Sequence, residues 1–390
     1  MSRQDRRTQG RRRAVRARQK AAAREREALE RRFVGRLAWR RELEQLVSAR
    51  GAAPEPRHRW FPYRQGFAPA LVRRFLEQAE RPPGPVLDPF AGSGTTAIEC
   101  ARQGVAAIGV EAIPELAAIG AAALLPPAAA RLPPPPAGPE QQLGALAARL
   151  HEPAHRAALL IALARSVRGD GTPRRHLPPL GERLRRCWEV IAEDLAAESL
   201  RARAWMLAGD ARRLPLRAAS CGALLTSPPY LGRFEYARLA APFAALAGAR
   251  ASPGSGPQLP AARHADAPAA GPPPHPAAAE ACARLWEGGR RRAARVVAGY
   301  VRGLAQALAE AARVLVPAAP AWIVLGGAFV HEVYVPADLI AAELAERAGF
   351  RLEGIEVARA LSASGGRRLG GLARVRPRES VLRLVRLNGR

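Results

Sequence analysis

Two short segments of the 390-residue chain combine residue types that could act on a bound ligand. The first runs from Asp88 to Thr95 as Asp-Pro-Phe-Ala-Gly-Ser-Gly-Thr, directly after an apolar stretch. The second runs from Thr226 to Tyr230 as Thr-Ser-Pro-Pro-Tyr, and it also follows apolar residues. Both read as a polar turn at the carboxyl end of a strand, which is where open α/β sheets bind ligands.

The first segment has the features of a loop that binds the polar end of a cofactor. Gly92 and Gly94 permit positive φ angles and let the backbone approach a ligand closely. A helix predicted from Thr95 would present free N–H groups to a carboxylate, and Asp88 could accept a hydrogen bond from an amino group. A glycine turn alone could be structural. The Gly-Lys-Ser/Thr of a P-loop is missing, which argues against a nucleoside triphosphatase.

The second segment suits an amine substrate. The successive prolines Pro228 and Pro229 stiffen the turn and lack backbone N–H donors, so its carbonyl oxygens face no competing donors. Carbonyl and hydroxyl oxygens can hold the two N–H groups of an amine, and the ring of Tyr230 could stack on a base. An ordinary proline-rich turn is the alternative in a chain with 36 prolines.

Together and in this order, the two segments resemble the cofactor loop and catalytic loop of S-adenosyl-L-methionine-dependent DNA amino-methyltransferases. This N4-cytosine and N6-adenine family includes members with a Thr-Ser-Pro-Pro-Tyr loop. The resemblance covers roughly residues 60–125 and 203–390. It implies S-adenosyl-L-methionine as the cofactor, DNA methylation as the activity and a restriction-modification context. Ser227 in the first loop position is similar to N4-cytosine enzymes, whereas Asp or Asn there is typical of N6-adenine and of guanine enzymes.

The order of the loops keeps an alternative open. Many enzymes with Ser-Pro-Pro-Tyr carry that loop before the cofactor loop, but here the cofactor loop comes first. Some RNA guanine amino-methyltransferases share this order, so a tRNA or rRNA base is the alternative substrate. A non-catalytic nucleic-acid-binding protein on the same fold is an alternative from a different class.

The resemblance assigns residues to both parts of the site. The catalytic residues are Ser227, Pro228, Pro229 and Tyr230, with Tyr230 stacking on a base flipped out of its helix. The cofactor-binding residues are Phe67, Asp88, Pro89, Phe90, Ala91, Gly92, Ser93, Gly94, Thr95, Glu111, Asp210 and Thr226. Glu111 would accept the ribose hydroxyls because it ends the next strand about 20 residues on. Asp210 would contact the adenine amino group, and Phe67 would pack on the cofactor unless it is a core aromatic. No metal ligand set is expected.

Elements of alternating type must position these residues. The apolar patterns predict strands over 85–88, 105–111, 204–207, 222–226, 321–325, 351–358 and 380–386. They predict helices over 69–79, 95–102, 113–125, 281–315 and 337–348. This alternation predicts an α/β fold with a doubly wound, mostly parallel, seven-stranded Rossmann-like methyltransferase sheet.

Composition divides the chain into four parts. Residues 1–55 form a basic extension with a helix expected over 21–47, whose apolar stripe is Leu29, Phe33, Leu37, Leu43 and Val47. Residues 56–125 hold the first part of the methyltransferase domain and 203–390 the second part, which includes a stretch expected to be disordered at 249–280. Residues 126–202 combine a Pro-rich extended linker at 126–139 with inserted helices over 141–168 and 180–200.

The net charge of +27 favours a polyanionic partner, so DNA is the expected partner and RNA the alternative.

Two cysteine patterns exclude other classes of site. The four cysteines form no Cys-x-x-Cys pair, and none follows a proline as in cytosine-C5 methyltransferases. No apolar run is long enough to span a membrane. We therefore expect a cytoplasmic protein with free thiols and no membrane partner.

Overall fold

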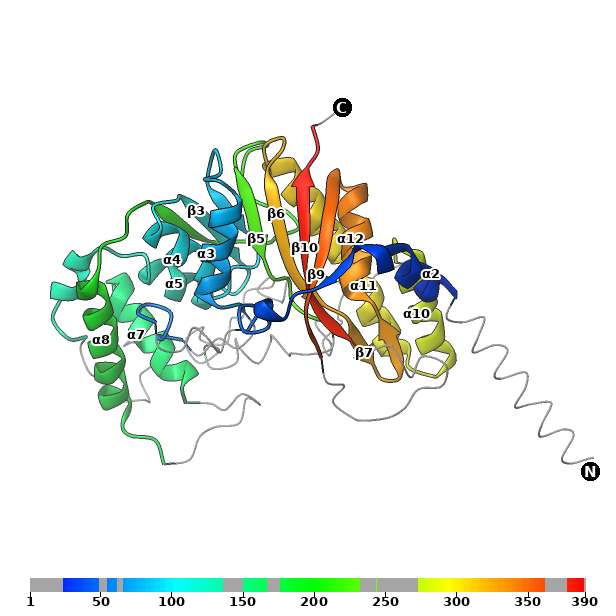
Figure 1. Cartoon of the computed structure of the whole chain (residues 1–390). Coiled ribbons are helices and arrows are strands. Elements are labelled where there is room, and N and C mark those ends of the chain that lie inside the picture. Colours follow the sequence, from blue (N-terminus) through cyan, green and yellow to red (C-terminus); the bar gives the residue numbers. More distant parts are fainter. Residues whose placement is uncertain are drawn as a thin grey trace, which may run out of the picture.

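A computed structural model describes residues 24–48, 55–61, 66–135, 150–166, 176–231, 243, 273–361 and 377–388. Within these ranges the chain folds around a sheet with helices on both faces (Figure 1). None of the described helices combines the length and the apolar composition that crossing a bilayer requires.

The main sheet has eight strands in the order β1-β9-β10-β6-β5-β2-β3-β4. Their bounds are β1 Leu37–Trp39, β2 Val86–Asp88, β3 Ala107–Glu111, β4 Ala204–Ala208, β5 Ala223–Thr226, β6 Pro320–Gly326, β9 Phe350–Ala360 and β10 Arg378–Arg386. Neighbouring strands are parallel except where β10 pairs antiparallel with β6 and β9. The doubly wound, mostly parallel α/β fold is confirmed, with all seven predicted strands present. The eighth is β1, which pairs parallel with β9 at the edge.

Helices cover the sheet on both faces because successive strand residues point to opposite sides. Their bounds are α2 Arg24–Phe33, α3 Pro69–Gln78, α4 Thr95–Arg102, α5 Pro114–Ala122, α7 Pro153–Ala164, α8 Leu180–Ala197, α10 Pro276–Glu287, α11 Arg291–Val314 and α12 Ala337–Arg347. On one face Leu87 and Leu224 share a core with α2, α10, α11 and α12. On the other face Val86 and Leu225 share a core with α3 and α4. A third cluster joins α5, α7 and α8 at the β4 end of the molecule.

The predicted N-terminal helix over 21–47 is wrong beyond Phe33. The chain turns through a 3₁₀ helix at Val34–Arg36, forms β1, and turns again through a second one at Arg41–Leu43. Gly35 is a weak helix former. The pairing of β1 with β9 provides hydrogen bonds for backbone groups that would otherwise have bonded within a longer helix. The apolar stripe itself was correctly identified, since Leu29, Phe33, Leu43 and Val47 are buried.

Four further segments differ from the sequence prediction. The helix expected over 281–315 is two helices, because Gly288 and Gly289 interrupt it and Gly289 has a φ of +74°. Helix α10 begins at Pro276, so the end of the stretch expected to be disordered is helical, while 249–272 lies outside the described residues. The extended linker contains a 3₁₀ helix at Pro127–Arg131 that packs beside α8. A hairpin of β7 (Ala328–Val330) and β8 (Val333–Val335) was not predicted.

Candidate cofactor and catalytic site

Three neighbouring parallel strands end in the polar residues that the sequence singled out. Strands β5, β2 and β3 lie side by side, and they end at Thr226, Asp88 and Glu111 respectively. The hydroxyl of Thr226 donates a hydrogen bond to Oδ1 of Asp88 at 2.6 Å. This contact joins the two segments across 138 positions of sequence, at the carboxyl edge of the sheet.

Asp88 lies at the centre of this edge and is almost fully buried. Its Oδ1 also accepts from the backbone N–H of Phe90 at 3.1 Å, and its Oδ2 accepts from the hydroxyl of Thr96 at 2.7 Å. Burial raises the pKa of Asp88 to about 6, although the hydrogen bonds from Thr226 and Thr96 oppose the shift. A carboxylate offers about four lone-pair positions, so one acceptor position remains for a ligand donor.

The glycine loop between β2 and α4 is held by Glu111. Gly92 has a φ of +55° and Gly94 has a φ of +94°, so both positions use the conformational freedom of glycine. The backbone N–H of Gly92 donates to Oε2 of Glu111 at 2.9 Å, and that of Ile113 donates to Oε1 at 2.9 Å. Burial raises the pKa of Glu111 against these two hydrogen bonds. Sequence reasoning did not foresee that this carboxylate shapes the loop.

The residues of the loop from Pro89 to Thr95 lie at the same edge of the sheet and differ in how far they are buried. Pro89, Ala91, Gly92 and Gly94 are buried, whereas Phe90, Ser93 and Thr95 are partly exposed. The first helical hydrogen bond of α4 runs from Ile98 N–H to Gly94. The N–H groups of the first turn of α4 therefore have no partner within the helix and can bind an anion.

The Ser-Pro-Pro-Tyr segment follows β5 at this edge. Ser227 is partly exposed, Pro228 and Pro229 are buried, and Tyr230 is 9% exposed. The hydroxyl of Tyr230 donates a hydrogen bond to Oε1 of Glu379 at 2.8 Å. Glu379 lies on β10, and sequence reasoning missed it. The other oxygen of Glu379 accepts from Nε of Arg359 on β9. The Ser-Pro-Pro-Tyr segment is thus anchored to strands from the far end of the chain.

Two assigned residues lie away from this cluster of contacts. Phe67 is buried in the apolar core that also contains Val86 and Leu225, as the core-aromatic alternative supposed. Asp210 follows β4 and pairs with Arg212 at 2.6 Å. Partial burial would raise the pKa of Asp210, but the hydrogen bonds and charge of Arg212 lower it overall. Cofactor contacts of both residues remain predictions.

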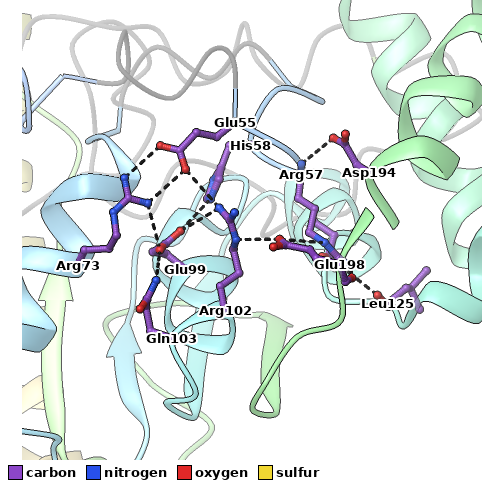
Figure 2. A network of polar contacts seen from close by, with 11 residues as sticks. Glu55, Arg57, His58, Arg73, Glu99, Arg102, Gln103, Leu125, Asp194 and Glu198 are labelled. Atoms are coloured by element: carbon purple, nitrogen blue, oxygen red, sulfur yellow. Dashed lines mark hydrogen bonds and ion pairs between the residues drawn. The ribbon is translucent and has the colours of Figure 1, made fainter. Parts of the chain in front are cut away.

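Behind α4, a polar network offers a candidate metal cluster (Figure 2). Ligand atoms of Glu55, His58 and Glu99 lie within 4.8 Å of one another. However, Arg73 and Arg102 each approach both carboxylates at 3.2 Å, so two cations already neutralise them. Burial opposes ionisation, yet the nearby His58, the hydrogen bond from Gln103 and the charges of Arg102 and Arg73 lower the pKa of Glu99 to about 2. The network therefore fastens residues 55–61 to α4 as a set of ion pairs.

Comparisons with known proteins bear on the first half of this site. Residues 15–122 match the N6/N4 methylase family, described as DNA methylase. Type II methyltransferase M.AvaI from a Nostoc species is 35% identical over 89 residues, which are 22% of this chain and 18% of that protein. Type II methyltransferase M.BsoBI from Geobacillus stearothermophilus is 36% identical over 70 residues, 18% of this chain and 14% of that protein. The matched part is thus less than one fifth of the length of these curated relatives.

Among solved structures, an S-adenosylmethionine-dependent methyltransferase from Methanosarcina mazei aligns with a TM-score of 0.35 and 10% identity. The alignment covers 81% of this chain and 98% of that one. The family match spans the glycine loop and Glu111 but ends before Ser227. It therefore concerns the cofactor half of the candidate site, and the catalytic half depends on the residues themselves.

Proposed function

We propose that this chain, which residues 15–122 relate to the N6/N4 DNA methylase family, methylates an exocyclic amine of a DNA base. The observation that carries the proposal is the hydrogen bond from Thr226 to Asp88. This hydrogen bond connects the ends of two adjacent strands, one followed by the loop suited to a cofactor and the other by the loop suited to an amine. S-adenosyl-L-methionine is the proposed methyl donor, and N4 of cytosine is the proposed acceptor.

The donor set at the edge fits S-adenosyl-L-methionine. The free N–H groups at the start of α4 suit the carboxylate of its methionine part, and the remaining acceptor position of Asp88 suits its ammonium. Each oxygen of Glu111 accepts one protein hydrogen bond, which leaves acceptor positions for ribose hydroxyls. When bound, the cofactor supplies an electrophilic methyl group on its sulfonium.

The residues after β5 would activate the amine by holding it. The lone pair of an exocyclic amine is delocalised into the base, so the amine is a poor nucleophile. The hydroxyl of Ser227 and a carbonyl of the Pro228–Pro229 turn would accept its two N–H bonds and draw the nitrogen toward sp³ geometry. The freed lone pair would form the new N–C bond in line as the methyl–sulfur bond breaks, which leaves the sulfur as a neutral thioether, and the methylated nitrogen would release one proton to solvent. The rate enhancement is positional and electrostatic.

Tyr230 and the charge of the chain would select a nucleic acid. Tyr230 is 9% exposed and Glu379 holds its hydroxyl, so a flipped base would stack on the exposed part of the Tyr230 ring. The net charge of +27 favours a phosphate backbone. Ser227 favours cytosine over adenine, by resemblance to N4-cytosine enzymes. The position of the cofactor loop ahead of the catalytic loop favours an RNA base as the second candidate.

A variant pair tests the division of labour in the site. We expect Ser227→Ala to lower methyl transfer while calorimetry shows unchanged S-adenosyl-L-methionine affinity. Ser220→Ala is the matched control, because its hydroxyl donates to the Arg217 carbonyl ahead of β5, at the opposite edge. Sequencing that distinguishes N4-methylcytosine from N6-methyladenine, on DNA from cells with and without the gene, tests the acceptor. An unchanged DNA methylome would refute the DNA substrate and favour RNA.

A further inference from the structure

Four exposed residues form a cationic and aromatic tip where α10 meets α11. The tip consists of Trp286, Arg290, Arg291 and Arg295. Trp286 is 48% exposed, and the guanidinium of Arg291 lies over its ring at 5.3 Å from the centroid. Within the described part of the chain, no carboxylate forms an ion pair with any of these three arginines. Arg313 near the other end of α11, by contrast, pairs with Glu310.

The topology puts this tip at the edge of the sheet that holds the candidate site. Helix α11 ends at Val314, and Leu315 then pairs with Cys221 just ahead of β5. The end of α11 is therefore at the amino edge of the parallel strands, and its beginning is at the carboxyl edge with Thr226 and Ser227. Figure 1 shows α11 beside the β6–β10 part of the sheet, and α10 packs against α11.

The length of α11 makes the tip project beyond that edge. Its 24 residues span about 36 Å at the rise of an α-helix. The seven residues of β6, which α11 leads into, span only about 23 Å. The first turns of α11 thus extend on the order of 10 Å past the end of β6, where the chain continues into the β7–β8 hairpin that packs against α10. The apolar face of the helix stays in the core with Leu231, directly after the catalytic segment.

We propose that this tip binds the phosphate backbone of duplex DNA beside the target base, an inference that rests on the proposed DNA substrate. Among the described residues, no carboxylate forms an ion pair with these three arginines, and guanidinium groups match the geometry of phosphate oxygens. Arg291 and Arg295 are four residues apart and so share one face of the helix. The cation–π contact with Trp286 holds Arg291 in a fixed direction, which lowers the entropy lost on binding.

The chain offers a matched control at the opposite edge. Arg201 and Arg203 precede β4, and Arg217 precedes β5 beside the end of α11. All three are exposed, like the arginines of the tip. The triple variants Arg290/Arg291/Arg295→Gln and Arg201/Arg203/Arg217→Gln therefore remove the same charge from opposite edges. Trp205→Ala is the matched control for Trp286→Ala, because Trp205 is 46% exposed.

The experiment measures binding of a mixed-sequence DNA duplex by fluorescence anisotropy over a range of salt concentrations. Each phosphate contact contributes about 0.9 to the slope of log K against log salt. The tip triple should flatten this slope by about 2 to 3 and weaken binding at least tenfold at low salt, whereas the control triple changes both less. Trp286→Ala should weaken binding more than Trp205→Ala does.

Equal slopes for the two triples would overturn the proposal. So would a tip triple that weakens binding to an RNA hairpin but not to the DNA duplex. A methyl-transfer assay with the unmodified chain tests the proposed function separately. If that chain methylates no DNA while the tip triple still loses duplex binding, the tip is supported and the enzymatic proposal fails.

Discussion

The hydroxyl of Tyr230 donates a hydrogen bond to Glu379 at 2.8 Å, which ties the Ser-Pro-Pro-Tyr segment to β10. The same Glu379 accepts from Arg359, so its carboxylate is shared between the tyrosine and a cation. Its neighbour Arg378 pairs with Asp338 at 2.7 Å and with Glu30 of α2 at 2.9 Å. One strand therefore connects the basic N-terminal part, the last helix and the catalytic segment.

This anchor predicts a loss of activity when the hydroxyl alone is removed. Tyr230→Phe keeps the aromatic ring but not the hydrogen bond, so we expect kcat for methyl transfer to fall three- to tenfold, as about 1 kcal/mol of lost positioning would do. Cofactor affinity by calorimetry should not change. Tyr230→Ala, which also removes the ring, should lose more activity. Wild-type kcat for Tyr230→Phe would show that the ring acts without its anchor.

The pKa of Asp88 predicts how cofactor affinity depends on pH. If the ionised carboxylate binds the cofactor ammonium, protonation competes with binding below the free pKa of about 6. Affinity for S-adenosyl-L-methionine should therefore fall about tenfold between pH 7 and pH 5. Calorimetry at three pH values measures this.

Two variants separate this effect from others at the same edge. Asp88→Asn should bind weakly and lose the steep pH dependence, whereas Glu111→Gln should keep it while binding less tightly. An affinity that stays constant from pH 7 to pH 5 in the unmodified chain would contradict the assigned contact between Asp88 and the ammonium.

The sequence predicts the shared edge but not its internal bonds. Apolar runs that end in polar turns place Asp88, Glu111 and Thr226 at the ends of strands, and parallel strands bring such ends together. The hydrogen bonds from Thr226 to Asp88 and from Gly92 to Glu111 depend on strand order, which no local pattern encodes. Glu379 was missed for the same reason. Its approach to Tyr230 depends on the register of β10 against β6 and β9.

Local patterns failed where long-range pairing changed the backbone. The apolar spacing through Leu37 continues the period of α2, but pairing with β9 imposes a strand there. The spacing through α10 and α11 also continues, although Gly289 at positive φ ends the first helix. Leu29, Phe33, Leu43 and Val47 of the predicted stripe are buried, whereas Leu37, which lies in β1, is only half-buried.

Glu99 predicts a stability effect with a defined pH window. Its pKa is lowered to about 2, so its ionised form stabilises the fold above the unfolded pKa near 4.5, and this contribution is lost as the pH falls toward 2. We expect Glu99→Gln to lower the free energy of unfolding by about 3 kcal/mol near pH 6. Urea unfolding measures it.

Lower pH should bring the variant and the unmodified chain together. Near pH 3 most of the unfolded-state Glu99 is protonated, so the difference should shrink by about 2 kcal/mol. Glu353→Gln is the control, because its ion pair with Arg351 is exposed and should contribute less than about 1 kcal/mol. A difference that is independent of pH would refute the role of the ionised Glu99.

The floor beneath the glycine loop predicts a conformational effect on binding. An added Cβ at Gly109 of β3 would lie 2.8 Å from the Cβ of Ala91 in the loop and 2.4 Å from Sδ of Met206. Met206 is flexible and can turn away, but Ala91 can move only with its backbone. Gly109→Ala should therefore displace the loop. Because overpacking costs about 1 to 3 kcal/mol, we expect S-adenosyl-L-methionine to bind at least tenfold more weakly.

The matched variant lies in a strand of the same sheet. An added Cβ at Gly354 of β9 meets no atom within 4 Å, so Gly354→Ala introduces the same methyl group without a collision. It should leave cofactor affinity unchanged and thermal stability equal or higher, since alanine has less backbone freedom to lose on folding. If calorimetry finds Gly109→Ala as tight a binder as Gly354→Ala, then the backbone at Ala91 does not form part of the cofactor site, and the assignment of the loop between Asp88 and Gly94 must be given up.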